Sequence, residues 1–325
     1  MRILSCLIKV PVLIASCMLI SCGGHRSSGP SAVDLEALGE VERISLGTDD
    51  IFPTSMTVVN GNVVFSLMRA ENSFFVVPIE SPQRAFQAGP KGRGPMDFLN
   101  VDPYSIKAEG DGFIVADMTG LKKCHLVDKG IEVNSLSSVT SKCLPLNGFS
   151  QVRGGYVNML ASRDKEFAVF DSQGNLKESM SPYPDWSKDT DTEKTFLYLK
   201  MWAPNLDGDK LAVFYSHFDK FRIINLSGKV LFEVDTDLGD SMEAENDLER
   251  ICYRSNPQVA SQFIAALHRN KEGAEVQIWD WKAQLHKRYA IPGNVTQFAI
   301  DWDAGKLWWF DSTSRTSLFG AKISI

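Results

Sequence analysis

A unit made only of strands recurs six times along this chain of 325 residues. In each unit a small residue precedes an apolar run, a short polar turn and a second apolar run. The second runs begin roughly 50 residues apart, at Asn62, Gly112, Gly155, Lys210, Gln262 and Lys306. A repeat of this length and kind is typical of a propeller blade. The sequence therefore predicts an all-β, six-bladed β-propeller with four antiparallel strands in each blade.

Turn residues separate the apolar runs. Pairs such as Asn60-Gly61 and Asp207-Gly208 favour tight turns between strands. This parsing places the first strands of the second and fourth blades over residues 104–108 and 196–202. It also predicts a short surface helix within residues 240–249 and a surface excursion over 181–195. The main alternative, a two-sheet sandwich, would not require a repeat of fixed length.

The sixth unit lacks one strand. Apolar runs over residues 295–300, 306–311 and 317–323 account for three strands, and no outer strand follows them. Near the other end of the chain, residues 41–46 alternate apolar and polar side chains but belong to no unit. We expect this segment to complete the sixth blade beside residues 317–323, which would remove the free sheet edges of the ring.

The first 21 residues have the features of a secretory signal. Arg2 precedes an apolar run over residues 10–20 that is too short to cross a bilayer as a helix. The run ends in Leu19-Ile20-Ser21-Cys22-Gly23, which resembles the bacterial lipoprotein box, where the cysteine receives lipid. We expect residues 1–21 to be removed and Cys22 to anchor the chain. The alternative is a plain signal peptide with an incidental cysteine.

The mature chain is expected to have two parts. Residues 22–38 begin with a stretch rich in Gly and Ser and are expected to form a flexible tether, and residues 39–325 are expected to form the propeller. The net charge of -6 disfavours nucleic acid as a partner, and we expect a monomer. Three cysteines remain in the propeller: Cys124, Cys143 and Cys252. One alternative is a disulfide between Cys124 and Cys143, and the other is that all three are buried free thiols.

A loop rich in Gly and Pro follows the first blade. It reads Gly89-Pro90-Lys91-Gly92-Arg93-Gly94-Pro95-Met96-Asp97-Phe98, and no helix follows that would make it a phosphate-binding loop. The segment resembles the Gly-x-Gly-Pro-Gly-Glu-Phe turn of the six-bladed, TolB-like and NHL-like propeller lipoproteins of Bacteroidetes. Gly92, Gly94, Pro95 and Phe98 match that turn, whereas Met96 and Asp97 depart from it. Bracing of two adjacent blades is the expected role, with ligand binding as the alternative.

The resemblance also bears on localisation. Bacteroidetes lipoproteins destined for the cell exterior resemble one another in an acidic cluster after the lipidated cysteine. That cluster is missing after Cys22. We therefore expect an envelope lipoprotein anchored in the outer membrane and facing the periplasm.

Candidate ligand-binding residues gather at the ends of second strands and in the loops between blades. The parsing places these positions at one end of the ring, where loops carry function on a rigid frame. The candidates are Arg69, Lys91, Arg93, Asp102, Asp117, Arg163, His217, His268, Arg269 and Asp311. Trp202, Trp302, Trp308 and Trp309 could stack on a sugar, or could be buried between blades.

These patterns favour a non-catalytic function. The chain contains no H-E-x-x-H, C-x-x-C or G-x-S-x-G pattern. We expect an envelope propeller that binds a protein or glycan partner through its loop-rich face and uses no cofactor. The alternative is a metal-dependent enzyme, because six-bladed propellers similar to this one include lactonases and lyases. The site of this enzyme would lie at the central channel, and its divalent metal would be held there by Asp102, Asp117, His217 and His268. A purely structural envelope component is a third possibility.

Overall fold

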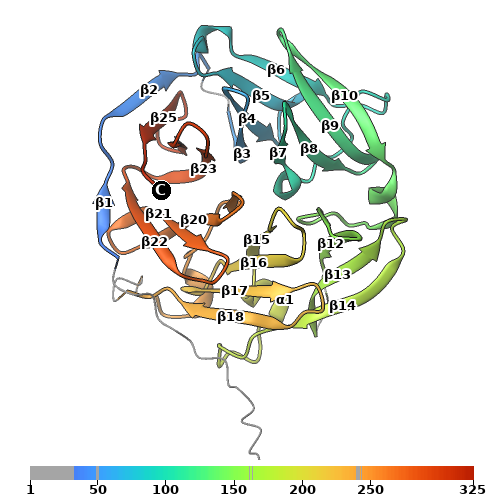
Figure 1. Cartoon of the computed structure of the whole chain (residues 1–325), viewed down its shortest axis with the longest axis vertical. Helices are drawn as coiled ribbons and strands as arrows, with labels where there is room; N and C mark the ends of the chain where they lie inside the picture. Colours follow the sequence, from blue (N-terminus) through green and yellow to red (C-terminus); the bar gives the residue numbers. More distant parts are fainter. Residues whose placement is uncertain (1–32, 49–50, 161, 163, 239–241, 243) are drawn as a thin grey trace, which may run out of the picture.

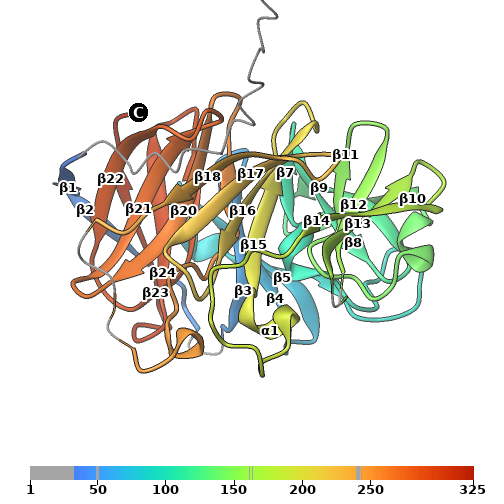
Figure 2. The same ribbon diagram turned by 90° about the horizontal axis from the view of Figure 1, so that it is seen from below.

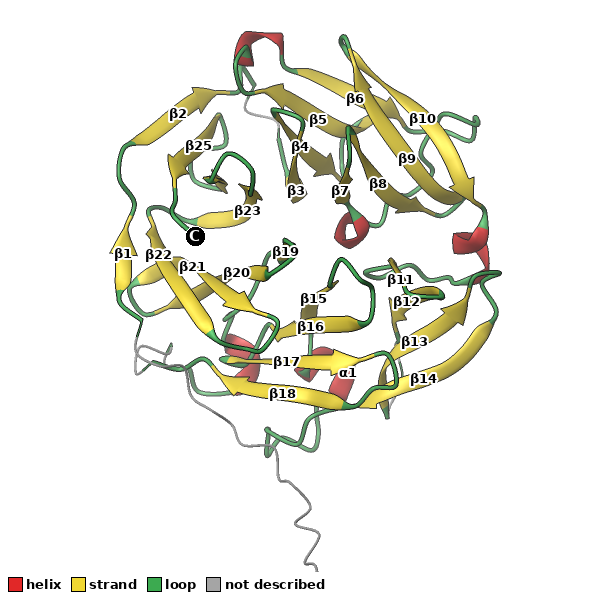
Figure 3. Ribbon diagram, viewed as in Figure 1, coloured by secondary structure: helices red, strands yellow, loops and turns green. Residues whose placement is uncertain are grey.

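Six sheets form a ring in the computed structural model, which describes residues 33–48, 51–160, 162, 164–238, 242 and 244–325 (Figure 1). Each sheet is a blade of antiparallel strands, so the chain is a six-bladed β-propeller. Helix in the described part is confined to short 3-10 segments and the four-residue α1 (Lys194–Leu197) (Figure 3). The predicted fold class is confirmed.

The strands of the first five blades follow one another along the chain, each blade running from the ring centre outwards. The first blade consists of β3 (Pro53–Val59), β4 (Asn62–Leu67), β5 (Asn72–Pro78) and β6 (Phe86–Pro90). The second consists of β7 (Lys107–Glu109), β8 (Gly112–Asp117), β9 (Gly120–Val127) and β10 (Gly130–Ser137). The third consists of β11 (Ser150–Val152), β12 (Gly155–Met159), β13 (Lys165–Asp171) and β14 (Leu176–Pro182). The fourth consists of β15 (Lys200–Pro204), β16 (Lys210–Tyr215), β17 (Lys220–Asn225) and β18 (Val230–Asp235). The fifth consists of β19 (Gln258–Val259), β20 (Phe263–Asn270), β21 (Gly273–Asp280) and β22 (Leu285–Ile291).

The sixth blade joins the two ends of the chain. Its inner strands are β23 (Val295–Asp301), β24 (Lys306–Asp311) and β25 (Ser317–Lys322), and its outer strand is β2 (Val41–Ser45). β2 pairs antiparallel with β25, with Ile44 opposite Leu318. The expected closure of the ring by residues 41–46 is confirmed.

A further strand precedes β2 and corrects the boundary of the expected tether. β1 (Leu35–Ala37) pairs parallel with β22 and adds a fifth strand to the fifth blade. Glu36 also forms an ion pair with Lys287 at 2.6 Å. Residues 35–37 therefore belong to the folded ring, although the Gly/Ser-rich sequence before them suggested a tether up to residue 38. Cys22 and residues 1–32 lie outside the described residues.

The loops between blades contain turns of helix where strand was expected. η2 (Pro103–Ser105) replaces the start of the strand predicted at 104–108, and its Pro103 occupies the first turn, where a missing N–H costs nothing. α1 replaces the start of the strand predicted at 196–202. Of the helix expected over 240–249, the described residues form only η4 (Asp247–Glu249). The other 3-10 helices of the described residues are η1 (Pro82–Arg84) and η3 (Val139–Lys142).

The core lies between neighbouring sheets. Trp308 and Trp309 are adjacent in β24, so their side chains point to opposite faces of the sixth blade. Trp308 packs with Phe65 of the first blade, and Trp309 packs with Ile278 of the fifth. Both indoles are buried, as is Trp202, whereas Trp302 is half-buried. Three of the four tryptophans therefore brace the ring.

Cys124, Cys143 and Cys252 are buried free thiols in this structure. Burial raises the pKa of Cys124 to about 12 and that of Cys143 to about 11. The thiols thus act as small apolar side chains. No helix among the described residues combines the length and apolar character needed to span a membrane.

Candidate functional site

A cavity of about 1350 Å³ lies at the centre of the ring and is lined by the inner strands of all six blades. Its mouth is formed by the turns that join the first and second strands, including Asn60-Gly61, Leu206-Asp207 and Trp302-Asp303. We call this end of the ring the cavity face. The opposite end carries the loops that join successive blades and is called the crossover face. Figure 2 shows the C-terminus on the cavity side and α1 on the crossover side.

The cavity wall combines aromatic rings with hydrogen-bonding side chains. Tyr104 is 39% exposed, and the half-buried Trp302 stacks with Phe263 at a centroid distance of 6.5 Å. Amide side chains of Gln151 and Gln258 line the same space. Aromatic faces pack against the apolar faces of a sugar while amides bond its hydroxyls, so the lining suits a polar organic ligand.

Charge at the mouth is predominantly acidic. Glu109, Asp207, Asp301 and Asp303 line it, against Lys107 and Arg153. Lys107 lies within the cavity wall, where desolvation lowers the pKa of its ammonium group. The negative charge of Glu109 raises that pKa, but the effect of desolvation is larger. The acidic excess favours a neutral or cationic ligand over an anionic one.

A contact across the ring forms the inner end of the cavity. Asn256, which leads into the fifth blade, donates from Nδ2 to the carbonyl oxygen of Pro103 in the second blade at 3.1 Å. Figure 3 shows η2 and β19 approaching each other near the ring centre. The cavity lining includes Thr57 to Val59 of β3 but not the earlier residues of that strand. The cavity is therefore deepest at this contact and opens on the cavity face.

None of the nine candidate residues that the structure describes lines this cavity. Arg163 lies outside the described residues. The sequence places the leading candidates at the rim where second strands end, which is the crossover face, and the metal donors of the alternative enzyme around the central channel. Pairs such as Asn60-Gly61 and Asp207-Gly208 mark turns of the mouth in the sequence, and the polar side chains of these turns are the signal that points to the site.

Asp102 holds the inner end of the cavity in place. Its Oδ1 accepts a hydrogen bond from Tyr104 N at 3.1 Å, and its Oδ2 accepts one from Phe149 N at 2.7 Å. The carboxyl thus caps η2 and joins the second blade to the third. Burial raises the pKa of Asp102, against these backbone hydrogen bonds. Asp102 is a positioning residue for the Tyr104 ring.

Asp117 and Asp311 end second strands and cap the turns that follow. Asp117 accepts hydrogen bonds from Thr119 Oγ1 at 2.5 Å and from Asn100 N at 2.7 Å. Asp311 accepts from Thr313 N and Thr313 Oγ1 at 2.8 and 2.7 Å. Burial alone would raise the pKa of Asp117, but these hydrogen bonds and Lys122 lower it. The shared Asp-x-Thr spacing is a repeated turn motif of the blades.

The histidine candidates are bound to neighbouring loops. His217 Nδ1 lies 2.7 Å from the carbonyl oxygen of Arg250. His268 is buried, with Nε2 at 2.8 Å from Asp219 Oδ1 and Nδ1 at 3.4 Å from Glu275 Oε1. Arg269 hydrogen bonds Asn294 in the loop that leads to the sixth blade. The contacts of His217 and Arg269 and the His268–Asp219 contact connect different segments of the crossover face, whereas Glu275 faces His268 from the paired strand of the same blade.

Arg69, Lys91 and Arg93 are the candidates that the structure brings together at the surface. All three are exposed on the crossover face. Lys91 Nζ donates to the carbonyl oxygen of Met68 at 2.5 Å, so the loop after β6 lies against the turn after β4.

The Gly/Pro-rich loop braces the first two blades, as expected. Phe98 is fully buried and packs edge-on against Phe74 at a centroid distance of 5.1 Å, in the cluster that includes Phe113 of the second blade. The Lys122 ammonium lies 4.6 Å from the Phe98 ring centroid.

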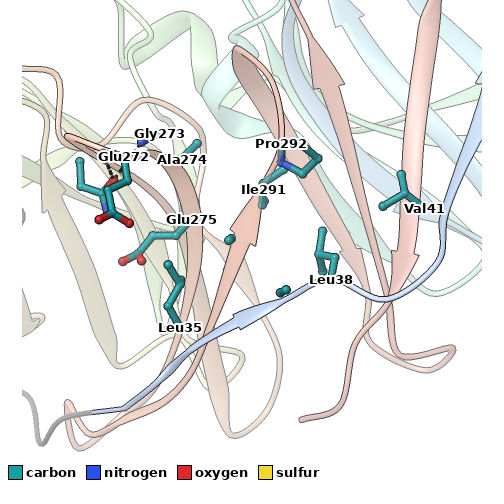
Figure 4. Close-up of a pocket in the computed structure, with 12 residues that line it drawn as sticks. Leu35, Leu38, Val41, Glu272, Gly273, Ala274, Glu275, Ile291 and Pro292 are labelled. Atoms are coloured by element: carbon teal, nitrogen blue, oxygen red, sulfur yellow. Dashed lines mark hydrogen bonds between the residues drawn. The ribbon is translucent and has the colours of Figure 1, made fainter.

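A smaller cavity of about 390 Å³ lies at the outer rim, between the segment from Leu35 to Val41 and the fifth blade. Figure 4 shows Leu35 and Leu38 directed toward this space from the N-terminal segment, with Ile291 and Pro292 on the other side. Leu38 packs against the core between the fifth and sixth blades. This cavity lies where the N-terminal segment packs against the fifth blade, so its lining residues serve the attachment of that segment to the ring.

Metal donors do not converge in the described part of the chain. No group of three or more His, Cys, Asp or Glu side chains there could hold a metal ion. Asp102, Asp117, His217 and His268 are each engaged in separate contacts.

Comparisons with known proteins support the fold. No protein-family model and no curated protein matches the chain. A Bacteroides fragilis protein classed as exported is similar at a TM-score of 0.51, with 12% identity over 88% of this chain and 95% of that chain. Regucalcin from Agrobacterium tumefaciens, a calcium-binding protein, is similar at a TM-score of 0.51, with 14% identity over 90% of this chain and 96% of that chain. At these identities the likeness shows the propeller fold alone.

Proposed function

We propose that this protein is a lipid-anchored, non-catalytic propeller of the bacterial envelope that binds a glycan in its central cavity. The cavity carries the proposal, because it has about 1350 Å³ of space with Tyr104 and Trp302 in its wall. This volume exceeds that of a typical small-ligand site, ~300–1,000 Å³, and is suited to an oligosaccharide. The acidic mouth favours neutral or amino sugars over uronic acids.

The contacts of the metal-donor candidates support binding rather than catalysis. The enzyme hypothesis needs Asp102, Asp117, His217 and His268 to share a divalent ion. Asp102 and Asp117 instead accept backbone N–H groups, and His268 is paired with Asp219. Moving any of them to a common ion would break a contact between blades or loops.

Calorimetry with soluble oligosaccharides would test the glycan site. We expect the full chain to bind neutral oligosaccharides and to bind uronic-acid oligosaccharides more weakly. Replacing both Tyr104 and Trp302 with Ala should weaken binding at least about tenfold, equivalent to ~1.4 kcal/mol. Phe196→Ala is the matched control, because Phe196 is 66% exposed on the crossover face. Absence of binding to every oligosaccharide class, or equal losses in both variants, would contradict the proposal.

Metabolic labelling with a radioactive fatty acid would test the anchor separately. The full chain should incorporate label and fractionate with outer membranes, and Cys22→Ser should do neither. Equal labelling of both forms would refute lipidation at Cys22 and leave the glycan site untouched.

A further inference from the structure

A second surface on the crossover face combines exposed methionines with cations. It consists of Met68, Arg69, Lys91, Arg93 and Met96, and is called the basic methionine patch. Met68 is 58% exposed and Met96 is 47% exposed. The Lys91–Met68 hydrogen bond joins the two loops that carry these residues. The patch is therefore continuous although it comes from two loops.

The charge of the patch is opposite to that of the whole chain. The protein has a net charge of -6, whereas the two loops that form the patch carry Arg69, Lys91 and Arg93 against the exposed Glu71 and the half-buried Asp97, whose carboxylate accepts a hydrogen bond from Gly94 N. Within the residues that the structure describes, no ion pair involves Arg69, Lys91 or Arg93. The guanidinium groups of Arg69 and Arg93 are available to an external carboxylate, whereas the Lys91 ammonium donates to the Met68 carbonyl oxygen.

The loop that presents Arg93 and Met96 is held in one conformation. Gly94 N donates to Asp97 Oδ2 at 2.9 Å, and Phe98 N donates to the carbonyl oxygen of Pro90 at 2.9 Å. A Cβ on Gly92 would lie 2.3 Å from Asp97 Oδ2, so the carboxylate fills the space that a side chain would need. A loop fixed before binding loses little conformational entropy when a partner docks.

We propose that the basic methionine patch docks a protein segment that combines carboxylates with apolar side chains. Met and Arg are enriched in protein interfaces, and clustered Arg side chains recognise acidic motifs. The patch supplies both, on a face that the proposed glycan does not use. It would let the propeller hold a glycan and a protein partner at the same time.

The attachment of the N-terminal segment favours a protein over a lipid surface. Val33 accepts a hydrogen bond from Arg288 at 3.4 Å and packs with Trp281 and Ala283, in a turn on the cavity face. An anchor at Cys22 would therefore join the ring on the side opposite the patch. This step rests on the proposed lipid anchor, whereas the patch itself does not.

Fluorescence anisotropy with labelled peptides would test the docking surface on the full chain. The probes are a peptide alternating Glu and Leu, one alternating Lys and Leu, and one alternating Glu and Ser. We expect the Glu-Leu peptide to bind best. The double variant Arg69→Glu, Arg93→Glu should weaken that binding at least about tenfold. Lys177→Glu with Lys282→Glu is the control, since it makes the same charge change at exposed positions elsewhere.

The outcomes separate this proposal from the others. Equal binding by the reversed and wild-type patches, equal binding of the Lys-Leu peptide, or no binding of any peptide would overturn it. The proposal would also be overturned if the full chain bound none of the peptides but sedimented with phosphatidylglycerol vesicles. That result would assign the patch to a membrane surface. The double variant Arg69→Glu, Arg93→Glu should bind oligosaccharides as the wild type does. A failure of the proposed glycan site can therefore be told apart from a failure of the proposed docking surface.

Discussion

His268 is a buried imidazole held between two carboxylates. Burial alone would lower its pKa, but the contacts with Asp219 and Glu275 outweigh burial and raise it to about 9. Arg288 Nη2 lies 2.7 Å from Glu275 Oε2. Burial alone would raise the pKa of Glu275, but the neighbouring His268 and Arg288 outweigh burial and lower it. His268 is therefore charged at neutral pH and joins the fourth blade to the fifth.

This cluster predicts a pH-dependent contribution to stability. Because the folded pKa is raised from 6.5 to about 9, the contribution is full below about pH 6.5 and is lost as the pH rises through 9. It amounts to on the order of 3 kcal/mol. Urea unfolding at several pH values should show His268→Gln less stable than wild type at low pH, with the difference shrinking at high pH.

A matched histidine provides the control for this experiment. His217 is half-buried and contacts a backbone carbonyl instead of two carboxylates. His217→Gln removes a histidine without removing a contact with a carboxylate, so it is the variant with which His268→Gln is compared at each pH. A constant difference between wild type and His268→Gln across the pH range would show that His268 carries no such linkage.

The same residue types were visible in the sequence, but their roles were not. An aspartate at the end of a strand can bind a ligand or cap a turn, and the two cases have the same local sequence. Asp117 and Asp102 are caps because the N–H groups of Asn100 and Phe149 lie beside them. Phe149 is 47 residues from Asp102, so local patterns could not reveal this partner.

At the scale of elements, the Gly/Pro-rich loop depends on one side chain. Gly92→Ala would place a Cβ 2.3 Å from Asp97 Oδ2, so Asp97 would rotate and lose its hydrogen bond to Gly94 N. The expected cost is about 1 kcal/mol, the worth of one such hydrogen bond. Chemical unfolding of Gly92→Ala would measure it.

A double-mutant cycle would check the cause of that loss. Asp97→Ala alone should cost a similar amount, because it removes the same hydrogen bond. Gly92→Ala should then add almost nothing in the Asp97→Ala background. Additive losses would mean that the glycine matters for another reason.

Strands were easier to predict than the segments between them. A blade strand shows as an apolar run because neighbouring sheets cover both of its faces. η2 and α1 contain aromatic residues that fit a strand equally well, and their helical form depends on Asp102 and on packing in the crossover loops. β1 was missed because its burial is low and its pairing with β22 is remote in sequence.

At the scale of the whole molecule, closure of the ring should govern stability. β2 contributes Ile44 to the core between the sixth and first blades, and Leu46 follows it there. β1 adds three residues at the outer rim. A chain beginning at residue 33 should melt like the full chain, one beginning at residue 38 slightly lower, and one beginning at residue 47 much lower. Thermal unfolding with limited proteolysis would rank them.

The reason for this order is the edge that each truncation exposes. Loss of β1 uncovers part of β22 at an already exposed rim, whereas loss of β2 uncovers β25 and opens the core beside it. Equal melting of the chains that begin at residues 38 and 47 would show that β2 is dispensable.

The all-β class, the number of blades and the strand that closes the ring can be read from the sequence alone, because apolar runs and their repeat are local and countable. Only the tertiary structure decided where a ligand can enter. The Asn256–Pro103 contact joins residues 153 positions apart, and the residues that line the cavity extend from Asn256 to the turns of the cavity face. No local pattern encodes such a contact, because it forms only when opposite blades meet across the ring.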